Sequence, residues 1–166
     1  MKKIRGCEIK QIEIANDFYE AYKRCSAAND KNQIVAIPAF VNGFFACELY
    51  LKSILSANNI NTPKNSSGHN IEKIFNLLPT ELKNTIKEKF SNEAKSIDGL
   101  NSVEFNELLN KMSFGFEFWR YIYEDKNKQF EKDYPFAYSE KFLSLFLPII
   151  EDKANKYVNL KKSGNA

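Results

Sequence analysis

The sequence predicts an all-α protein, an up-and-down bundle of four to five main helices. Apolar residues recur at spacings of three and four positions along most of the chain, which is the pattern of amphipathic helices. No two segments alternate apolar and polar residues as paired strands do. The 166 residues, 43% of them hydrophobic, are enough to form one core. We therefore expect a single domain over residues 1–160, with a flexible tail at residues 161–166.

Two long helices are expected in the first third of the chain. The first, Ile12 to Ala28, places apolar side chains at three-to-four spacing, and the helix-ending residues Asn29 and Asp30 follow it. The second extends from Gln33 to Asn58, and Pro38 either lies within its first turns, where proline is tolerated, or marks a kink.

The middle of this second helix, Ala39 to Leu55, is apolar around nearly its whole circumference. A helix with so little polar surface packs on several sides at once. We therefore expect it to be the central helix of the domain.

Two loops and two shorter helices are expected next. The first loop covers Asn58 to Gly68, which is rich in turn-forming residues. Asn70 to Leu77 predicts a short helix, and Pro79 marks the start of another from Thr80 to Phe90. The segment Ser91 to Gly99 is interpreted as the second loop.

A fourth major helix is expected from Ser102 to Asp125. Its apolar stripe consists of Phe105, Leu109, Met112, Phe116, Trp119 and Tyr123. Gly115 within it costs about 1 kcal/mol relative to alanine, which the close approach of a neighbouring helix would explain. The last helix, Tyr138 to Asn159, contains Pro148, which should bend it or split it near Leu147.

Composition argues against several classes of protein. Acidic and basic residues are interspersed and give a formal charge of +3, so the lysine-rich segments Lys83–Lys89 and Lys126–Lys132 are interpreted as exposed helix faces rather than an RNA-binding patch. No apolar run reaches the length of a signal-peptide core or a membrane span. Cys7, Cys25 and Cys47 show no paired spacing. We expect a cytoplasmic protein with reduced thiols, without membrane contact, and with neither a metal nor a cofactor.

Asn42, Glu48 and Lys52 are the polar exceptions on the central helix. Glu48 falls in line with the core residues, and Lys52 follows one turn later, so the two can be neighbours. An ionised glutamate at a core position needs a cation or several donors, or else the side chain remains protonated with a raised pKa. The candidate partners are Lys52, Arg120 and the backbone amides at the start of the helix after His69. The cluster is either a buried polar network that fixes helix register or a site at the helix interface.

Arg120 lies inside an aromatic run and has several possible roles. It can stack on Trp119 or Tyr123, pair with Glu124 one turn later, or hold a carboxylate or phosphate in a bidentate contact. The first two roles are structural, and the third is functional.

His69 stands at or just before a helix start and follows a glycine. There it can cap the helix or anchor the loop by hydrogen bonding to a carboxylate. An acid–base role would need a second group nearby, for which Glu48, Arg120, Tyr121 and Glu124 are available.

In order, the chain contains a helix reading ACELYLKSIL, a polar loop, the segment GHNIEKIFNLLP and a later helix with Arg120-Tyr121 near its end. This order resembles the HEPN superfamily, small α-helical domains named for their occurrence in higher eukaryotes and prokaryotes and for suspected nucleotide binding. Members carry an "ALEL-x-LKALL" type helix followed by a "GHDL-x-x-L" type segment. The matching residues are Glu48, Leu49, Leu51, Lys52, Gly68, His69, Ile71 and Leu78.

The resemblance covers roughly Pro38 to Glu124. It implies a four-to-five-helix up-and-down bundle, usually a dimer, often in a bacterial defence, toxin–antitoxin or nucleotidyltransferase-linked setting. Many members are metal-independent ribonucleases, whose signature is an Arg and a His with four to six residues between them.

The chain departs from this ribonuclease signature. Carried onto Arg120, the spacing reaches Asp125, Lys126 and Asn127, and His69 is the one histidine of the chain. Cleavage by a 2′-hydroxyl needs both a base and an acid. The departure therefore favours a HEPN-like domain that has lost this catalysis.

We expect the domain to bind a partner protein, a nucleic acid or a nucleotide through the groove between its helices. The candidate ligand-binding residues are Asn42, Glu48, Lys52, His69 and Arg120. The alternative is a metal-independent ribonuclease toxin with an atypical active site. Its candidate catalytic residues are His69, Arg120, Tyr121 and Glu124.

A homodimer is the expected assembly, and RNA, a nucleotide or a nucleotidyltransferase-type protein are the expected partners. A further hypothesis is a pure interaction module, in which exposed rings form the homodimer interface. Those rings are Phe114, Phe116, Phe118, Tyr134, Phe136 and Tyr138.

Overall fold

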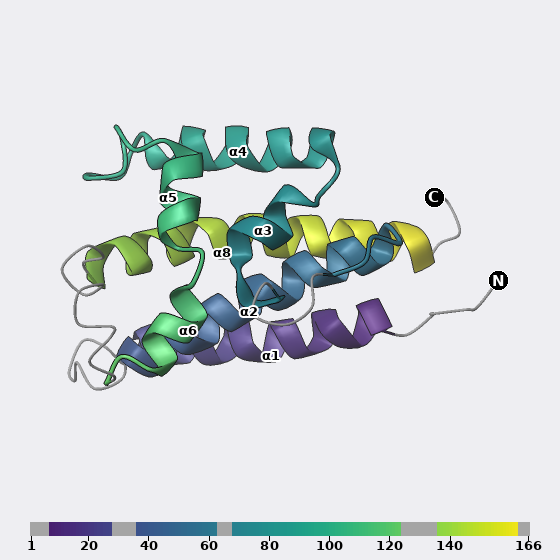
Figure 1. Ribbon diagram of the computed structural model, residues 1–166, viewed down its shortest axis with the longest axis horizontal. Helices are drawn as coiled ribbons and strands as arrows, with labels where there is room; N and C mark the ends of the chain where they lie inside the picture. The colour runs from purple at the N-terminus through teal and green to yellow at the C-terminus, as the bar shows by residue number, and fades with distance from the viewer. Residues whose placement is uncertain (1–6, 28–35, 63–67, 124–135, 163–166) are drawn as a thin grey trace.

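The computed structural model describes residues 7–27, 36–62, 68–123 and 136–162, and within these ranges all regular secondary structure is helical (Figure 1). The helices are α1 (Cys7–Ala27), α2 (Ala36–Ala57), α3 (Ile71–Asn76), α4 (Thr80–Ala94), α5 (Phe105–Lys111), α6 (Gly115–Arg120) and α8 (Phe136–Lys162). The predicted all-α class is confirmed.

The long helices α1, α2, α4 and α8 follow the long axis of the molecule in alternating directions (Figure 1). α1 packs on α2, α2 packs on α8, and α4 packs on α8. The shorter α3 and α6 lie against α2, and α5 contacts both α3 and α4. This is the predicted up-and-down bundle, with short helices that bring the segments around residues 69 and 116 next to α2.

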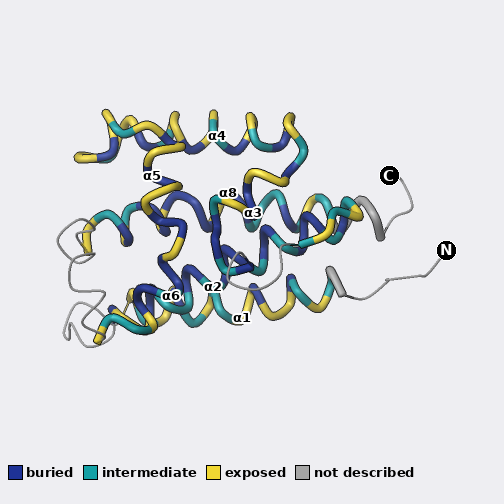
Figure 2. Tube along the Cα trace, in the orientation of Figure 1, coloured by how far each residue is buried: buried dark blue, intermediate teal, exposed yellow. Residues whose placement is uncertain are grey.

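α2 is the central helix, as its apolar circumference predicts. Figure 2 shows mainly buried and half-buried residues along its length. Gly43 allows close approach on two sides, because an added Cβ would lie 2.9 Å from Cδ2 of Tyr22 in α1 and 2.8 Å from Cδ1 of Leu143 in α8. The close packing of apolar side chains around α2 is the main source of stability.

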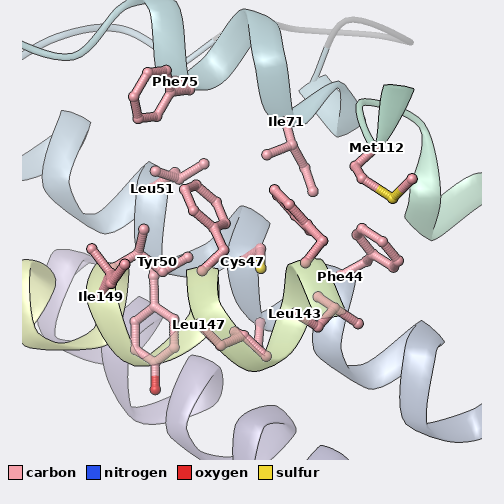
Figure 3. Packing of buried hydrophobic residues seen from close by; sticks show 14 of the residues in the cluster. Phe44, Cys47, Tyr50, Leu51, Ile71, Phe75, Met112, Leu143, Leu147 and Ile149 are labelled. Carbon is pink, nitrogen blue, oxygen red and sulfur yellow. The ribbon is translucent and has the colours of Figure 1, made fainter. Parts of the chain in front are cut away.

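Aromatic rings fill the space between α2 and its neighbours and between α8 and α4. In Figure 3, side chains of α2, α3 and α8 meet in one continuous apolar cluster. On the side of α4, five rings have centroids 4.8 to 6.4 Å apart. These rings are Phe75, Phe90, Phe105, Phe142 and Phe146.

The prediction of a single helix from Ser102 to Asp125 is wrong, because the segment forms two short helices, α5 and α6. The carbonyl of Ser113 accepts a hydrogen bond from the backbone N–H of Ile71 at 3.0 Å, so it is engaged by α3 at the break between α5 and α6. Tyr123, expected on the buried stripe, is 75% exposed, and Asp125 lies outside the described residues.

Gly115 is explained as the sequence suggested, by the close approach of a neighbouring helix. A Cβ at this position would lie 2.5 Å from Cε1 of Phe44 in α2, which is far inside van der Waals contact. Any larger residue would displace the Phe44 ring or the whole of α6. The glycine therefore sets how closely α6 packs on α2.

Other helix boundaries also differ from the prediction. α1 begins at Cys7, five residues before the predicted start at Ile12. α4 continues to Ala94, so the first four residues of the predicted loop Ser91–Gly99 are helical. α8 extends through Pro148 without splitting and reaches Lys162, two residues into the predicted tail. Proline removes the N–H that would bond to the carbonyl of Ser144. Because Pro148 and Ser144 are both exposed, water can bond to that carbonyl instead.

Candidate functional site

Glu48 is the buried carboxylate around which the candidate site is built. Its side chain is 2% exposed, yet both of its oxygens are hydrogen bonded. Oε1 accepts from Nζ of Lys52 at 2.6 Å, and Oε2 lies 3.0 Å from Nδ1 of His69. The structure thus confirms Lys52 as a partner of Glu48 and adds His69 as the second. Two donors on two oxygens satisfy the carboxylate and allow its burial.

The position of His69 is well defined, since each of the two residues that follow it is anchored to the rest of the fold. Asn70 is the N-cap of α3, and its Oδ1 accepts from the N–H of Lys73 at 2.8 Å. The N–H of Ile71 donates to the carbonyl of Ser113. His69 therefore anchors the loop through Glu48, as proposed from the sequence, while the capping role belongs to Asn70.

The hydrogen bond to Glu48 determines which nitrogen of His69 carries a proton. A carboxylate that already accepts from the Lys52 ammonium can only accept from the imidazole as well, so Nδ1 carries the hydrogen. The imidazole is 42% exposed, although Glu48 is buried. The second nitrogen, Nε2, is therefore the atom that the ring can offer to a ligand.

The ring of Phe116 connects His69 to Arg120. Its centroid lies 5.8 Å from that of His69, at an interplanar angle of 30°, and 5.7 Å from the guanidinium carbon of Arg120. On α2, Phe45 stacks on the same ring at 4.9 Å. We call the five residues Glu48, Lys52, His69, Phe116 and Arg120 the His69 site.

Arg120 is an exposed cation held by aromatic contacts. Its guanidinium lies over Phe116 and, at 5.2 Å, over Tyr121, rather than over Trp119 or Tyr123. Cation–π contacts of this kind orient the guanidinium without using its N–H groups. Among the described residues Arg120 has no hydrogen bond and no ion pair, so no group in this part of the chain occupies its N–H donors.

The three other candidate residues are Asn42, Tyr121 and Glu124. Asn42 is half-buried six residues before Glu48, so at about 100° per residue it points about 120° away around α2. Tyr121 is half-buried beside Arg120, and its ring meets Tyr123 edge-on. Glu124 lies outside the described residues, so an Arg120–Glu124 pair stays a prediction.

Sequence reasoning missed the part played by Phe116 and Phe45. It assigned Phe116 both to a core stripe and to a set of exposed rings, whereas the ring lies under His69 and Arg120. The spacing in the sequence could have indicated these neighbours, because Phe116 is one helical turn before Arg120 and Phe45 is three residues before Glu48.

The rings proposed for a homodimer interface fall into two groups. Phe116 and Phe118 are buried, so that part of the hypothesis is wrong. Phe114 and Phe136 are exposed, Tyr138 is half-buried, and Tyr134 lies outside the described residues.

Cys47, next to Glu48 in the sequence, points into the core and takes no part in the His69 site. Burial raises the pKa of its thiol well above the usual value, which keeps it protonated and unreactive. Within residues 7–27, 36–62, 68–123 and 136–162, no three His, Cys, Asp or Glu side chains are close enough to hold a metal ion. No helix of this part of the chain has the length and apolarity needed to cross a membrane.

No family model, curated protein or solved structure matches this chain.

Proposed function

We propose that this chain is a HEPN-like helical domain that binds a nucleotide or nucleic acid at the His69 site without cleaving it. The observation that carries the proposal is the state of Arg120. Its guanidinium is exposed, held over two rings and without an ion pair among the described residues. Arginine in this state is suited to bidentate contact with a phosphate.

The contact between the two HEPN-like motifs supports the same proposal. Glu48 and Lys52 belong to the first motif and His69 belongs to the second, and Glu48 is hydrogen bonded to both of the other side chains. The resemblance is therefore carried by residues that act together in the fold rather than by isolated matches.

The charges of the His69 site also favour an anionic ligand. Lys52 and Arg120 are cations, and the one carboxylate, Glu48, is 2% exposed and already engaged. A ligand that approaches from solvent meets the Arg120 guanidinium and the imidazole rather than the carboxylate.

Binding to a fluorescently labelled RNA oligonucleotide and to AMP tests the proposal. Because charge-assisted hydrogen bonds contribute about 1.5–3 kcal/mol, Arg120→Ala should weaken binding by about tenfold or more. Arg24→Ala is the matched control, since Arg24 is an exposed arginine on α1 that pairs with Glu20. The proposal fails if the wild-type protein binds neither probe, or if the two variants weaken binding equally.

A ribonuclease is the second candidate, and the Glu48–His69 hydrogen bond favours it. A carboxylate that holds Nδ1–H leaves Nε2 able to take a proton, as a general base must. The described residues offer no second titrating group in contact with His69 to serve as the acid, which is why we rank this candidate lower.

An RNA cleavage assay in EDTA separates the two candidates. Cleavage by the purified protein that is abolished by both His69→Ala and Arg120→Ala would replace the binding proposal with the ribonuclease. Toxicity of the gene when it is expressed alone, lost in the same variants, would agree with that outcome.

The proposal includes the assembly and setting that the resemblance implies: a homodimer, a nucleotidyltransferase-type partner and a role in bacterial defence or a toxin–antitoxin pair. Phe114 and Phe136 are the exposed rings left for a dimer interface. Light scattering on the wild type and on Phe114→Ser tests this, since a dimer that uses Phe114 should dissociate in the variant.

A further inference from the structure

We infer that the break between α5 and α6 is a hinge at which two copies of this chain exchange α6 and α8. When the hinge straightens, α5 and α6 form one helix, and α6 and α8 of each copy pack on α1, α2 and α4 of the other. The inference does not depend on the ligand of the His69 site, and such a dimer differs from one that forms through exposed rings.

The sequence and the fold disagree at this break. The apolar stripe continues at three-to-four spacing from Phe105 to Trp119, which is the pattern of one helix. The structure interrupts the helix at residues 112–114. Where local preference and tertiary structure conflict, a second arrangement of the chain lies closer in energy.

The backbone at the break is already close to helical. Met112 has φ −84° and ψ 1°, and Phe114 has φ −108° and ψ 19°. The N–H groups of Ser113 and Gly115 donate to carbonyls three residues earlier, at 3.1 and 3.0 Å, as in a tight helical turn. The chain can therefore straighten through modest changes, mainly in ψ.

Straightening would also complete the hydrogen bonds at the start of α6. This helix begins without a side-chain cap, and no described residue accepts from the N–H of Phe116 or Glu117. In one continuous helix these groups donate to the carbonyls of Met112 and Ser113. The bent form is held instead by tertiary contacts, which are the bond from Ile71 to the Ser113 carbonyl and the packing of α6 on α2.

α6 and α8 are joined to each other, so they would move as a unit. Nε1 of Trp119 donates to Oγ of the buried Ser139 at 3.0 Å, and the rings of Trp119 and Phe136 meet edge-on at 6.1 Å.

The surfaces that receive this unit all precede the hinge. α6 packs on α2, and α8 packs on α1, α2 and α4. Release of the unit alone would expose buried apolar side chains, which is strongly unfavourable. A second copy offers the same surfaces, so an exchanged dimer keeps these contacts and changes only the hinge.

Refolding of the full chain from denaturant tests the inference, because exchange requires the two parts of the chain to separate. We expect refolding at about 1 mM to give a dimer and refolding at about 10 µM to give a monomer, as measured by light scattering. The dimer should persist after dilution, since its dissociation requires α6 and α8 to leave the partner copy.

Cross-linking shows which copy α8 packs on. Nζ of Lys141 on α8 donates to the carbonyl of Asp98, which precedes the hinge. Asp98→Cys and Lys141→Cys therefore place two thiols within reach of a short bis-maleimide. Cys7→Ser and Cys25→Ser remove two native thiols, and Cys47 is buried. In the refolded dimer the link should join two chains, which gives a covalent dimer on a denaturing gel. A link made first in the monomer should prevent the dimer from forming.

Phe114→Ala separates exchange from a dimer that forms through exposed rings. Alanine favours a helix more than phenylalanine does, and an exchanged dimer contains two hinges, so its association constant should rise about fivefold. A dimer that uses the exposed ring of Phe114 should be weakened by the same change. Leu77→Ala is the matched control, because Leu77 is an equally exposed apolar residue away from the hinge. It should leave the constant unchanged.

The outcomes separate this inference from the proposed function. A monomer at both refolding concentrations overturns the inference. A dimer that dissociates on dilution, or that carries its cross-links within single chains, also overturns it and leaves the homodimer of the proposed function standing. An exchanged dimer that binds neither RNA nor AMP supports the hinge and overturns the binding proposal alone. If a cysteine variant fails to fold, refolding and dilution of the wild-type chain decide.

Discussion

Glu48 and His69, separated by 21 residues in the sequence, are joined by a 3.0 Å contact between Oε2 and Nδ1, and the carboxylate is almost fully buried while the imidazole is 42% exposed. One polar group thus lies inside the bundle and its partner lies at the surface. The contact holds the loop before α3 on α2. It also makes the orientation of the exposed imidazole depend on a buried carboxylate.

Glu48→Gln should lower the free energy of unfolding by about 1–3 kcal/mol. A buried amide cannot accept from both Lys52 and His69 as the carboxylate does, so one donor is left unpaired. Urea denaturation followed by circular dichroism measures the change. Glu20→Gln is the control, because Glu20 also bonds to two cations, Lys23 and Arg24, but in solvent. Its urea midpoint should match that of the wild type, and equal losses in both variants would contradict the role given to burial.

Gly115→Ala should destabilise the fold by about 1–3 kcal/mol, because the added methyl group overlaps the buried ring of Phe44. Gly43→Ala is the companion variant. Its methyl group would lie 2.9 Å from the ring atom Cδ2 of Tyr22 and 2.8 Å from Cδ1 of Leu143, both of them buried, so it should also destabilise the fold. The loss should be smaller than the overlap alone would cause, because alanine gains up to about 1 kcal/mol over glycine within a helix.

A double-mutant cycle identifies the cause of the Gly115→Ala effect. Phe44→Leu should cost less in the Gly115→Ala background than in the wild type, since the smaller side chain relieves the overlap. Additive effects would show that the two residues do not meet as described.

Cys47 should resist thiol reagents until the protein unfolds. Burial raises the pKa of its thiol, and the thiolate is the reactive form. Cys25 is half-buried on α1 and should react first. In a Cys7→Ser background, Ellman's reagent should therefore modify one thiol quickly and the other only in denaturant. Two fast equivalents in the native state would place Cys47 nearer to solvent than the structure does.

Stability should fall as the pH rises above about 10. Burial is the main cause that raises the pKa of Tyr22 from 10.0 to about 12, and it also raises that of Tyr50. Between pH 10 and 12 the unfolded chain releases the Tyr22 proton while the folded chain retains it, so the free energy of unfolding decreases with pH. Tyr22→Phe should make this decrease shallower. Tyr123→Phe, at a position that is 75% exposed, should leave the slope unchanged.

The sequence was enough to predict the long helices and the central place of α2, because the three-to-four spacing of apolar residues directly reflects burial along a helix. It could not show the break between α5 and α6. The apolar stripe continues at the same spacing across Ser113 and Gly115. At the break, the carbonyl of Ser113 accepts a tertiary hydrogen bond from Ile71, and the Phe44 ring lies against Gly115. The hydrogen bond leaves no local pattern in the sequence, and the glycine indicated a close approach but not a helix end.

The candidate site, too, was predicted only in part, because some of its contacts are local in the sequence and others are not. Glu48 and Lys52 are one turn apart on a helix, and their pairing follows from helical geometry. His69 was expected to bond to a carboxylate, but the donors considered for Glu48 were Lys52, Arg120 and backbone amides, because the Glu48–His69 contact joins residues far apart in the sequence. Arg120 and His69 each contact the ring of Phe116, whose hydrophobic character gave no reason to separate it from the rest of the core.

The consecutive residues His69, Asn70 and Ile71 are fixed by three separate bonds, to Glu48, to the first turn of α3 and to the carbonyl of Ser113. This part of the proposed His69 site is therefore preorganised: a ligand that contacted His69 would meet a ring whose backbone is already held by these bonds. The entropic cost of binding should fall on the ligand rather than on the protein, which favours affinity from few contacts. If the proposed binding of an oligonucleotide occurs, backbone order parameters at these three residues should accordingly change little.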